Sequence, residues 1–282
     1  MTSPAAEIFV KGAKILREDP RRCGNTVNIE GECSMLVSGD LHGNRPALAR
    51  IIQACGIRKS PTSFLLLQEL IHGELEASTG LDRSVDLLLR AVRLLIDFPT
   101  QVLFVMGNHD LAQATGGEIT KNTGNVCQAF AQGVLDSYGE HGPEVLDAIY
   151  EFLLAMPLAI RLPNRLQISH TLPCPWRMKL ADPGILTRPS APEDLKRGGP
   201  VYEWTWGRNQ NDQQLEQLAE QLDVDLFVLG HRHVPDGIEA IGERAVILNS
   251  DNLRGCVLPI DCTRSYSVTD AMQAAVPVSA LV

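Results

Sequence analysis

Residues 34–55 read SMLVSGDLHGNRPALARIIQAC, and this stretch decides the fold class. Its first part is an apolar run that ends at Asp40, which is the pattern of a buried strand leaving the core at its carboxyl end. Leu48, Ile51 and Ile52 then recur at helical spacing. The stretch therefore predicts a strand over 34–40 followed by a helix over 45–55, which is the repeating unit of an α/β fold.

The same alternation of short apolar runs and longer amphipathic stretches continues along the chain. Residues 173–210 are rich in Pro, Gly and Trp and are predicted to form a long loop over one face. No low-complexity linker interrupts the sequence, so we expect a single α/β domain over residues 1–282 with its core at about 34–261. Further strands are expected at 63–69, 101–110, 162–170 and 224–233, with 243–252 and 255–261 as a final pair, and helices at 82–99 and over much of 111–160.

Composition excludes several classes of protein. A net charge of −9 and a pI of about 5.3 argue against a nucleic-acid surface, which requires a basic footprint. No apolar run is long enough for a transmembrane helix, and the N-terminus lacks the pattern of a signal peptide, so we expect a cytoplasmic protein without a membrane partner. The seven cysteines are scattered without a C-x-x-C pair, and we expect them to be reduced.

Polar side chains follow the ends of the predicted strands. Each of these residues alone could be a helix cap or a turn former. Helix caps and turns do not explain why so many of them occur together at strand ends. Sites in open α/β sheets are built at the carboxyl ends of strands. All of the seven histidines except His141 belong to this set, which also contains carboxylates and an amide. The residues are Asp40, His42, Glu69, His72, Asn108, His109, His170, His231 and His233.

These residue types define a chemistry. Carboxylate, amide and neutral imidazole are mixed O/N ligands, which suit Mn²⁺, Fe or Zn²⁺ better than Ca²⁺. A carboxylate between two halves of the set can bridge two metal ions. Two such ions polarise a phosphoryl oxygen and lower the pKa of a shared water that attacks in line. The set therefore predicts metal-assisted hydrolysis of phosphoesters.

Four short motifs give the sequence a resemblance to the calcineurin-like metallophosphoesterases. GDLHGN (39–44) is similar to GD-x-HG, GNHD (107–110) to GNH-[DE] and GHRH (230–233) to GH-x-H. ISHTLP (168–173) lies where that family has an isolated metal-binding His. Over about 34–261 the sequence is most similar to the phosphoprotein phosphatases. The resemblance implies a two-sheet β-sandwich flanked by helices, with two divalent metal ions at its loop-rich edge.

The resemblance also implies roles for individual residues. His109, with Asp110 beside it, would be catalytic, stabilising charge or protonating the leaving oxygen. Glu69 would bridge the two metals. The implied ligands are Asp40, His42 and His233 for the first metal, and Asn108, His170 and His231 for the second.

The second motif of that family, GD-x-x-DRG, is replaced here by QELIHGE (68–74). Glu69 falls on the bridging Asp and His72 on the second Asp. Gly73 falls on the Arg, which removes the guanidinium that grips phosphate in that family. Another residue must supply that contact. The candidates for binding substrate are Asn44, Arg45, His72, Arg197, Arg208 and Arg254.

Three functions stay open at the level of sequence. The first is a dinuclear-metal phosphomonoesterase that resembles protein serine/threonine phosphatases. The second is a hydrolase of small phosphoesters or nucleotides, such as dinucleoside polyphosphates, which the missing Arg favours. The third is a catalytically weak relative that binds metal, or a phosphorylated partner, without efficient turnover. Each implies a phosphorylated partner, and none fixes the oligomeric state.

Overall fold

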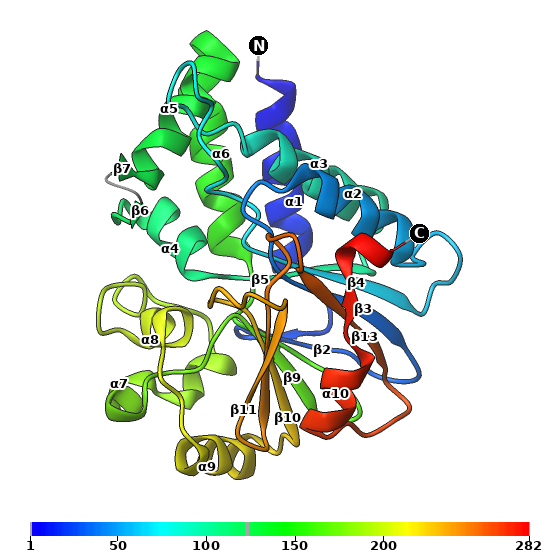
Figure 1. The fold of residues 1–282 in the computed structure, drawn as a ribbon. Coiled ribbons are helices and arrows are strands. Elements are labelled where there is room, and N and C mark those ends of the chain that lie inside the picture. The colour runs from blue at the N-terminus through cyan, green and yellow to red at the C-terminus, as the bar shows by residue number, and fades with distance from the viewer. Residues whose placement is uncertain (1, 122–123, 282) are drawn as a thin grey trace.

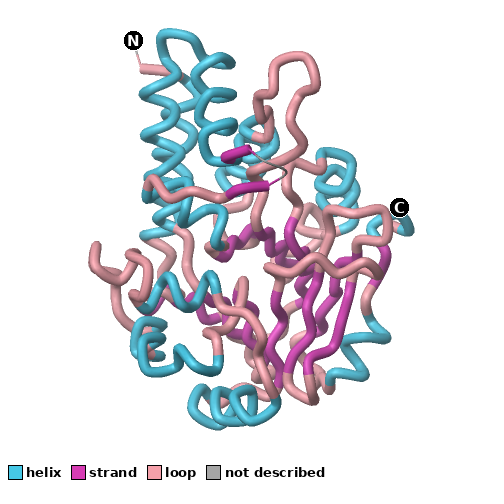
Figure 2. Tube along the Cα trace, turned by 60° about the vertical axis from the view of Figure 1, so that its left-hand side comes forward, coloured by secondary structure: helices cyan, strands magenta, loops and turns pink. Residues whose placement is uncertain are grey.

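Two β-sheets pack face to face in the computed structural model, which describes residues 2–121 and 124–281 (Figures 1 and 2). Among these residues one sheet has five strands in the order β14-β13-β3-β4-β5, and the other has seven in the order β1-β2-β8-β9-β10-β12-β11. Helices flank the pair on both outer faces, as Figure 1 shows. The predicted two-sheet α/β sandwich is therefore confirmed.

The five-stranded sheet is built around the strand that opens the sequence motif. Strands β3 (Ser34–Asp40), β4 (Ser63–Gln68) and β5 (Val102–Val105) run parallel. Strand β13 (Cys256–Asp261) pairs antiparallel with β3, and β14 (Val276–Pro277) pairs with β13. Because the three central strands are parallel, their carboxyl ends lie at one edge of the sheet.

The seven-stranded sheet supplies the second face of the sandwich. Its central pair, β9 and β10, is parallel, and β12 runs parallel to β10 on the other side. A short sheet of β6 and β7 stands apart from both. The strands not yet given are β1 (Arg22–Cys23), β2 (Thr26–Asn28), β6 (Thr120–Lys121), β7 (Gly124–Asn125), β8 (Ala159–Arg161), β9 (Leu166–Ser169), β10 (Leu226–Leu229), β11 (Ile238–Ile241) and β12 (Ala245–Leu248).

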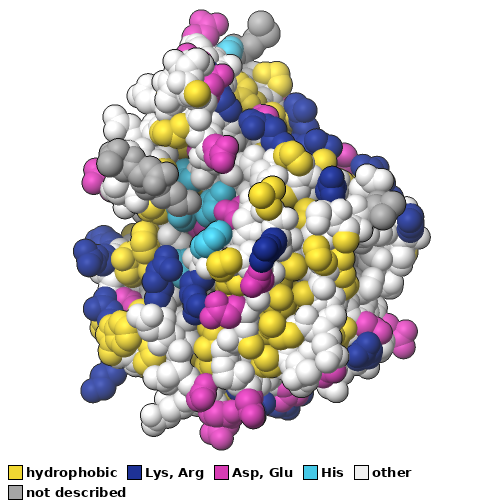
Figure 3. Space-filling view, viewed as in Figure 1, with side chains coloured by type: hydrophobic (Ala, Val, Ile, Leu, Met, Phe, Trp, Pro, Cys, Tyr) yellow, Lys and Arg dark blue, Asp and Glu magenta, His cyan; other side chains and the backbone are white. Residues whose placement is uncertain are grey.

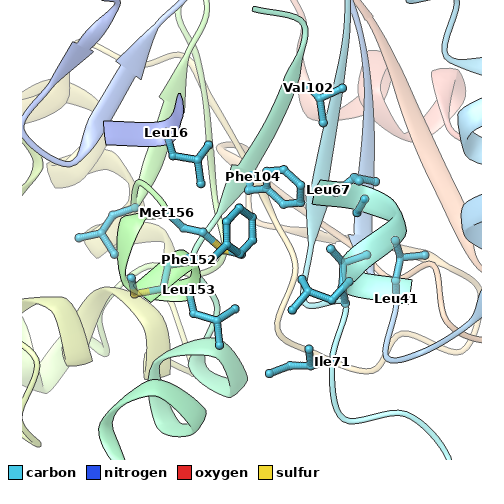
Figure 4. Packing of buried hydrophobic residues seen from close by; sticks show 14 of the residues in the cluster. Leu16, Leu41, Leu67, Ile71, Val102, Phe104, Phe152, Leu153 and Met156 are labelled. Carbon is cyan, nitrogen blue, oxygen red and sulfur yellow. The ribbon is translucent and has the colours of Figure 1, made fainter. Parts of the chain in front are cut away.

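Alternation along the strands sorts side chains between two cores. In β4, Leu66 lies in the buried cluster between the sheets, whereas Leu65 and Leu67 lie in the cluster beneath the helices. On the helical side, the rings of Phe104 and Phe152 meet edge to face at 5.5 Å (Figure 4). This packing explains why the strands read as continuous apolar runs, since both of their faces are buried.

The helices follow the predicted positions with small shifts at their ends. α2 (Arg45–Ala54) and α3 (Val85–Asp97) confirm the two helices expected early in the chain. Asn44 begins α2 by accepting a hydrogen bond from the backbone N–H of Ala47. The other helices are α1 (Pro4–Arg17), α4 (Asn108–Thr115), α5 (Val126–Tyr138), α6 (Gly142–Ala155), α7 (Met178–Ala181), α8 (Pro200–Trp206), α9 (Asp212–Leu222) and α10 (Val268–Ala274), with 3-10 turns at Gly139–His141, Pro175–Arg177, Pro183–Leu186 and Val278–Ala280.

Two expectations about the later part of the chain were wrong. β12 and β13 do not pair with each other, because β12 belongs to the seven-stranded sheet and β13 crosses to the five-stranded one. The segment 173–210 is not a single irregular loop, since it folds into the short helices α7 and α8 and two 3-10 turns. Trp204, which is fully buried, explains this order, and its indole N–H donates to the backbone oxygen of Ala181.

The expectation that all cysteines are reduced was also wrong. Cys33 and Cys262 form a disulfide, with their Cα atoms 5.1 Å apart. The pairing of β3 with β13 brings these two cysteines together, because Ser34 lies opposite Asp261 and Cys262 donates its N–H to the Cys33 oxygen. A separation of 229 residues hides this proximity in the sequence. As for the membrane, none of the described helices combines the length and the apolar character needed to cross one.

We predict that the denatured, unreduced protein exposes five reactive thiols, because the disulfide removes two of the seven cysteines. Titration with a thiol reagent before and after reduction measures this number, which should rise to seven. The variant Cys33→Ser is the control, since it should give the same count before and after reduction. Seven thiols in the unreduced wild type would contradict the pairing.

Candidate metal centre

The polar residues predicted from the strand ends meet where the edges of the two sheets touch. Asp40 at the end of β3 forms a parallel bridge to Asn249, just beyond β12, and its backbone oxygen accepts from Ser250 N–H. A Cβ on Gly39 would lie 2.3 Å from the Leu248 oxygen, so this crossing requires glycine. Figure 3 shows histidine side chains gathered in a hollow on this face. The crossing brings residues from both sheets into one site.

The backbone turns sharply at four of the site residues. His42, Glu69, His72 and His231 have φ values of 38°, 35°, 64° and 72°, in the left-handed region that L-residues other than glycine rarely adopt. Such strain costs about 1–3 kcal/mol per residue and persists where the surrounding structure holds it. The turns point these side chains back across the strand ends, toward one another.

One group of candidate metal ligands consists of His42, Glu69 and His109, whose donor atoms lie within 4.8 Å of one another. His42 Nε2 lies 3.5 Å from Glu69 Oε2, and its Nδ1 lies 2.9 Å from the Ile71 oxygen. Because a carbonyl can only accept, the Nδ1 of His42 carries the proton. The Nε2 lone pair therefore faces the site, which is the arrangement of a metal-binding imidazole.

A second group consists of Asp40, Glu69 and His170 and is buried throughout. His170 Nε2 lies 3.3 Å from Glu69 Oε1, and Asp40 Oδ1 accepts the backbone N–H of His231 at 3.1 Å. Asn108 Oδ1 lies 2.7 Å from His231 Nδ1 and 3.1 Å from His170 Nε2. The structure thus brings all the predicted ligands of the second metal beside Asp40 and Glu69.

Glu69 belongs to both groups, and its carboxylate lies between them. One oxygen faces His42, whereas the other accepts the backbone N–H of His109 at 2.8 Å and faces His170. The longer side chain of Glu fits because residue 107 is glycine, where a Cβ would lie 2.1 Å from Glu69 Oε1. Glu69 is therefore the carboxylate that the two donor groups share.

The two buried imidazoles of the second group favour the neutral form. Burial lowers the pKa of His170 well below its usual value, and neighbouring His231 lowers it further. Burial lowers the pKa of His231 to about 3, with Arg208 adding to the shift. His231 Nε2 and His170 Nδ1 have no hydrogen-bond partner among the described residues. Neutral imidazoles that converge with carboxylates and an amide oxygen in a buried site fit a divalent cation.

His109 and His72 form the next layer of the site. Their Nδ1 atoms lie 2.6 Å apart, and His72 Nε2 lies 2.8 Å from Gln113 Oε1. The Gln113 amide nitrogen donates in turn to Tyr150 Oη at 3.3 Å, which leaves its oxygen for His72. His72 thus donates from Nε2 and accepts at Nδ1 from His109. The Nε2 of His109 is left with its lone pair.

Two predicted site residues lie apart from these donor groups. Asp110 caps α4 by accepting the backbone N–H of Gly107 at 2.9 Å, and burial raises the pKa of its carboxyl to about 7. His233 is exposed and belongs to neither group of donor atoms found among the described residues. A catalytic role for Asp110 and a metal-binding role for His233 stay predictions, and this geometry does not support them.

Most of the candidates for gripping phosphate are already engaged. Arg45 forms a two-fold ion pair with Asp86, and Arg254 pairs with Asp236 at 2.7 Å. Asn44, besides capping α2, donates to the Asp251 oxygen. Arg197 is exposed and lines a separate cavity of about 620 Å³ between α4 and α8.

Arg208 differs from these candidates. It follows α8, is exposed and, like Arg197, forms no ion pair with any described residue. Its charge nevertheless acts on both buried imidazoles, because it lowers the pKa of His170 and of His231. The sequence contained no signal that singled it out from the other arginines. The fold does so because the Thr171 hydroxyl, next to His170, donates to the backbone oxygen of Gly207 at 2.8 Å, which holds the chain before Arg208 beside the second donor group.

Comparisons with known proteins agree with this geometry. Residues 34–235 match the model of the calcineurin-like phosphoesterase family. A serine/threonine-protein phosphatase of Caenorhabditis elegans is 22% identical over 234 residues, which are 78% of this chain and 47% of that protein. The chain therefore spans about half the length of this curated relative.

Two solved structures share the fold at low sequence identity. A serine/threonine phosphatase of Saccharomyces cerevisiae matches with a TM-score of 0.66 and 16% identity, over 91% of this chain and 82% of that one. A cold-active protein-tyrosine phosphatase of a psychrophilic Shewanella matches with a TM-score of 0.58 and 13% identity, over 88% and 79%. Since the family model covers most of the sequence and the donor groups suit divalent metal ions, this chain belongs to the calcineurin-like phosphoesterases.

Proposed function

We propose that the protein is a dinuclear-metal-dependent phosphomonoesterase with chemistry similar to that of serine/threonine phosphatases. The observation that carries the proposal is the Glu69 carboxylate, which belongs to both groups of donor atoms. A carboxylate shared in this way is what holds two ions close enough to act on one phosphoryl group. The serine/threonine phosphatase relative supports the choice of reaction.

The residues of the two groups have distinct tasks in this proposal. His42 and Asp40 would hold one ion, and Asn108, His170 and His231 the other, with Glu69 between them. Two divalent ions bound there would polarise the phosphoryl group and activate a water molecule for in-line attack. Burial of the ligands excludes bulk water, which strengthens the attraction between these groups and a phosphate dianion.

The phosphate would be gripped by Arg208. A guanidinium binds phosphate with two parallel hydrogen bonds, and Arg208 has no carboxylate partner among the described residues to compete for it. Position 73 cannot easily supply this contact, because a Cβ on Gly73 would lie 3.1 Å from Gly43 Cα and 3.2 Å from the His42 oxygen. The chain therefore grips phosphate from the loop after α8.

The oxygen of the leaving alcohol would contact His109. His109 belongs to the first donor group, and His72 fixes its ring by accepting its Nδ1–H. Gln113 and Tyr150 hold His72 in the matching tautomer. His72 is thus a positioning residue for His109, in place of the carboxylate that orients the corresponding histidine in the resembling family.

A hydrolase of small phosphoesters is the second candidate. The close approach of Gly43 and Gly73 favours it, because a phosphate clamp that has moved to another loop suits a different substrate. Comparing a phosphothreonine peptide with a dinucleoside polyphosphate separates the two candidates by kcat/KM. The phosphomonoesterase proposal requires the peptide to be the better substrate.

The proposed reaction is tested with an aryl phosphate and added Mn²⁺. We expect metal-dependent hydrolysis that falls at least about 100-fold in Asp40→Asn, because the amide removes charge from the buried donor set. Glu220→Gln is the control, since Glu220 is an exposed carboxylate on α9 and should keep wild-type activity. Hydrolysis that is equally fast in Asp40→Asn would contradict the proposal.

Metal content tests the position of Glu69 without any assay of activity. We predict two divalent ions per chain in the metal-loaded wild type and at most one in Glu69→Gln, because one bridging carboxylate serves both ions. Elemental analysis after dialysis gives the stoichiometry. A Glu69→Gln protein that is folded by circular dichroism and still binds two ions would show that Glu69 is not the bridge.

For Arg208, we predict that Arg208→Gln weakens inhibition by inorganic phosphate about 10-fold to 100-fold and raises KM for aryl phosphate, since it removes a bidentate contact. Arg254→Gln is the matched control, because Arg254 is an exposed arginine already paired with Asp236. Equal inhibition constants in the wild type and in Arg208→Gln would assign the phosphate contact to another residue.

A further inference from the structure

A second cavity opens beside the first donor group. Its volume is about 720 Å³, which is within the range of pockets that bind small molecules. His42 and His72 line its inner wall, and the loop from Glu74 to Ser84 and the start of α2 line the rest. A group attached to the phosphate through the leaving oxygen would enter this space, because His109 lies between His42 and His72.

Two buried polar side chains in the wall of this cavity each carry one atom without a hydrogen-bond partner among the described residues. Asp82 is 1% exposed and Ser84 is 2% exposed, and both line the cavity. Asp82 Oδ1 accepts the backbone N–H of Ser84 at 2.7 Å. In contrast, Asp82 Oδ2 and Ser84 Oγ form no hydrogen bond of good geometry with any described residue. Buried polar atoms are rarely left in this state without a ligand or a water molecule. Burial raises the pKa of the Asp82 carboxyl, whereas the nearby Ser84 and the Gly73 N–H act in the opposite direction.

The position of Asp82 is fixed by the fold. Its backbone N–H donates to the Ala129 oxygen on α5, and it pairs with Leu75 in a short bridge. α5 comes this close because residue 133 is glycine, where a Cβ would lie 1.9 Å from the Asp82 oxygen. The carboxylate is therefore held in place before any ligand arrives, which reduces the entropy lost on binding.

The balance of charge in the cavity is negative. Two arginines line it, but Asp86 holds Arg45, and Glu76 and Asp136 hold Arg83. Their charges are thus compensated outside the cavity. The three carboxylates that line it, Glu74, Asp82 and Asp251, have no ion pair among the described residues.

We propose that this cavity binds a positively charged group, an ammonium or a guanidinium, carried by the leaving alcohol of the phosphoester. The proposal rests on the proposed function, because it places the phosphate at the donor groups and the cation beside them. A second phosphate is disfavoured there, since the three carboxylates would repel it. The ammonium would donate hydrogen bonds to Asp82 Oδ2 and Ser84 Oγ.

Non-hydrolysable pairs of ligands test the cavity independently of turnover. 2-Aminoethylphosphonate and propylphosphonate have nearly the same shape, but only the first carries an ammonium. We expect the Mn²⁺-loaded protein to bind the ammonium compound about 10-fold more tightly in isothermal titration. A second arm compares peptides that carry a non-hydrolysable phosphonate analogue of phosphothreonine, with lysine or norleucine beside it, which distinguishes a peptide source of the cation from a small amine.

Variants then assign the preference to the cavity. In Glu74→Gln with Asp251→Asn, and separately in Asp82→Asn, the preference for the cation should fall to about twofold or less. Glu220→Gln on α9 is the control and should keep the full preference. A preference in either arm that these variants abolish supports the proposal. Equal binding of the charged and neutral members in both arms, or a preference that the variants leave unchanged, would overturn it.

The same experiment separates this proposal from the proposed function. A protein that hydrolyses aryl phosphate but shows no preference for a cation retains the function and loses the cavity assignment. A protein that fails to hydrolyse aryl phosphate but binds the ammonium phosphonate more tightly retains the cavity and loses the reaction. Because binding is measured without turnover, each result decides one of the two claims.

Discussion

The carboxylate of Glu69 is the constraint on which the rest of the site depends. It is buried, its backbone adopts a strained left-handed conformation, and its two oxygens face different sets of donors. The backbone oxygen of Glu69 also holds the chain just after β3, because it accepts hydrogen bonds from the N–H groups of Leu41 and His42. Gly107 at the end of the neighbouring strand leaves room for its side chain. Three parallel strand ends are thus arranged around one acidic group.

An electrostatic asymmetry across the site follows from this arrangement. On the side of the second donor group, Arg208 presents a guanidinium without a carboxylate partner among the described residues. On the side of the first donor group, the cavity wall carries Asp82, Glu74 and Asp251. A substrate that is negative at its phosphate and positive at its leaving group matches this polarity. Such matching gives specificity and orientation more than affinity.

The fold and the donor set were predictable because local patterns determine them. Apolar runs that end in polar residues located the strands, and the carboxyl ends of parallel strands must meet at one edge. The sequence therefore indicated Asp40, Glu69, Asn108 and His170 before their distances were known. The pairing of β12 with β13 was wrong because two adjacent apolar runs do not show that the chain crosses between sheets. The disulfide of Cys33 was hidden for the same reason, since only the pairing of β3 with β13 creates it.

Charged residues in loops were the least predictable part. Arg208 was one of several arginines, and only the folding of the segment 173–210 into short helices brings its charge to bear on His231. Asp110 and His233 matched motifs, yet one caps a helix and the other is exposed. A motif fixes which residue types are present, whereas the direction of a side chain depends on contacts made elsewhere in the chain.

The most direct test of the account is anomalous X-ray diffraction from crystals soaked in Mn²⁺ and an oxyanion such as vanadate. We predict two anomalous peaks about 3.5–4 Å apart with Glu69 oxygens bound to both ions, and the oxyanion in contact with Arg208. A single peak, or two ions without a shared Glu69 ligand, would contradict it.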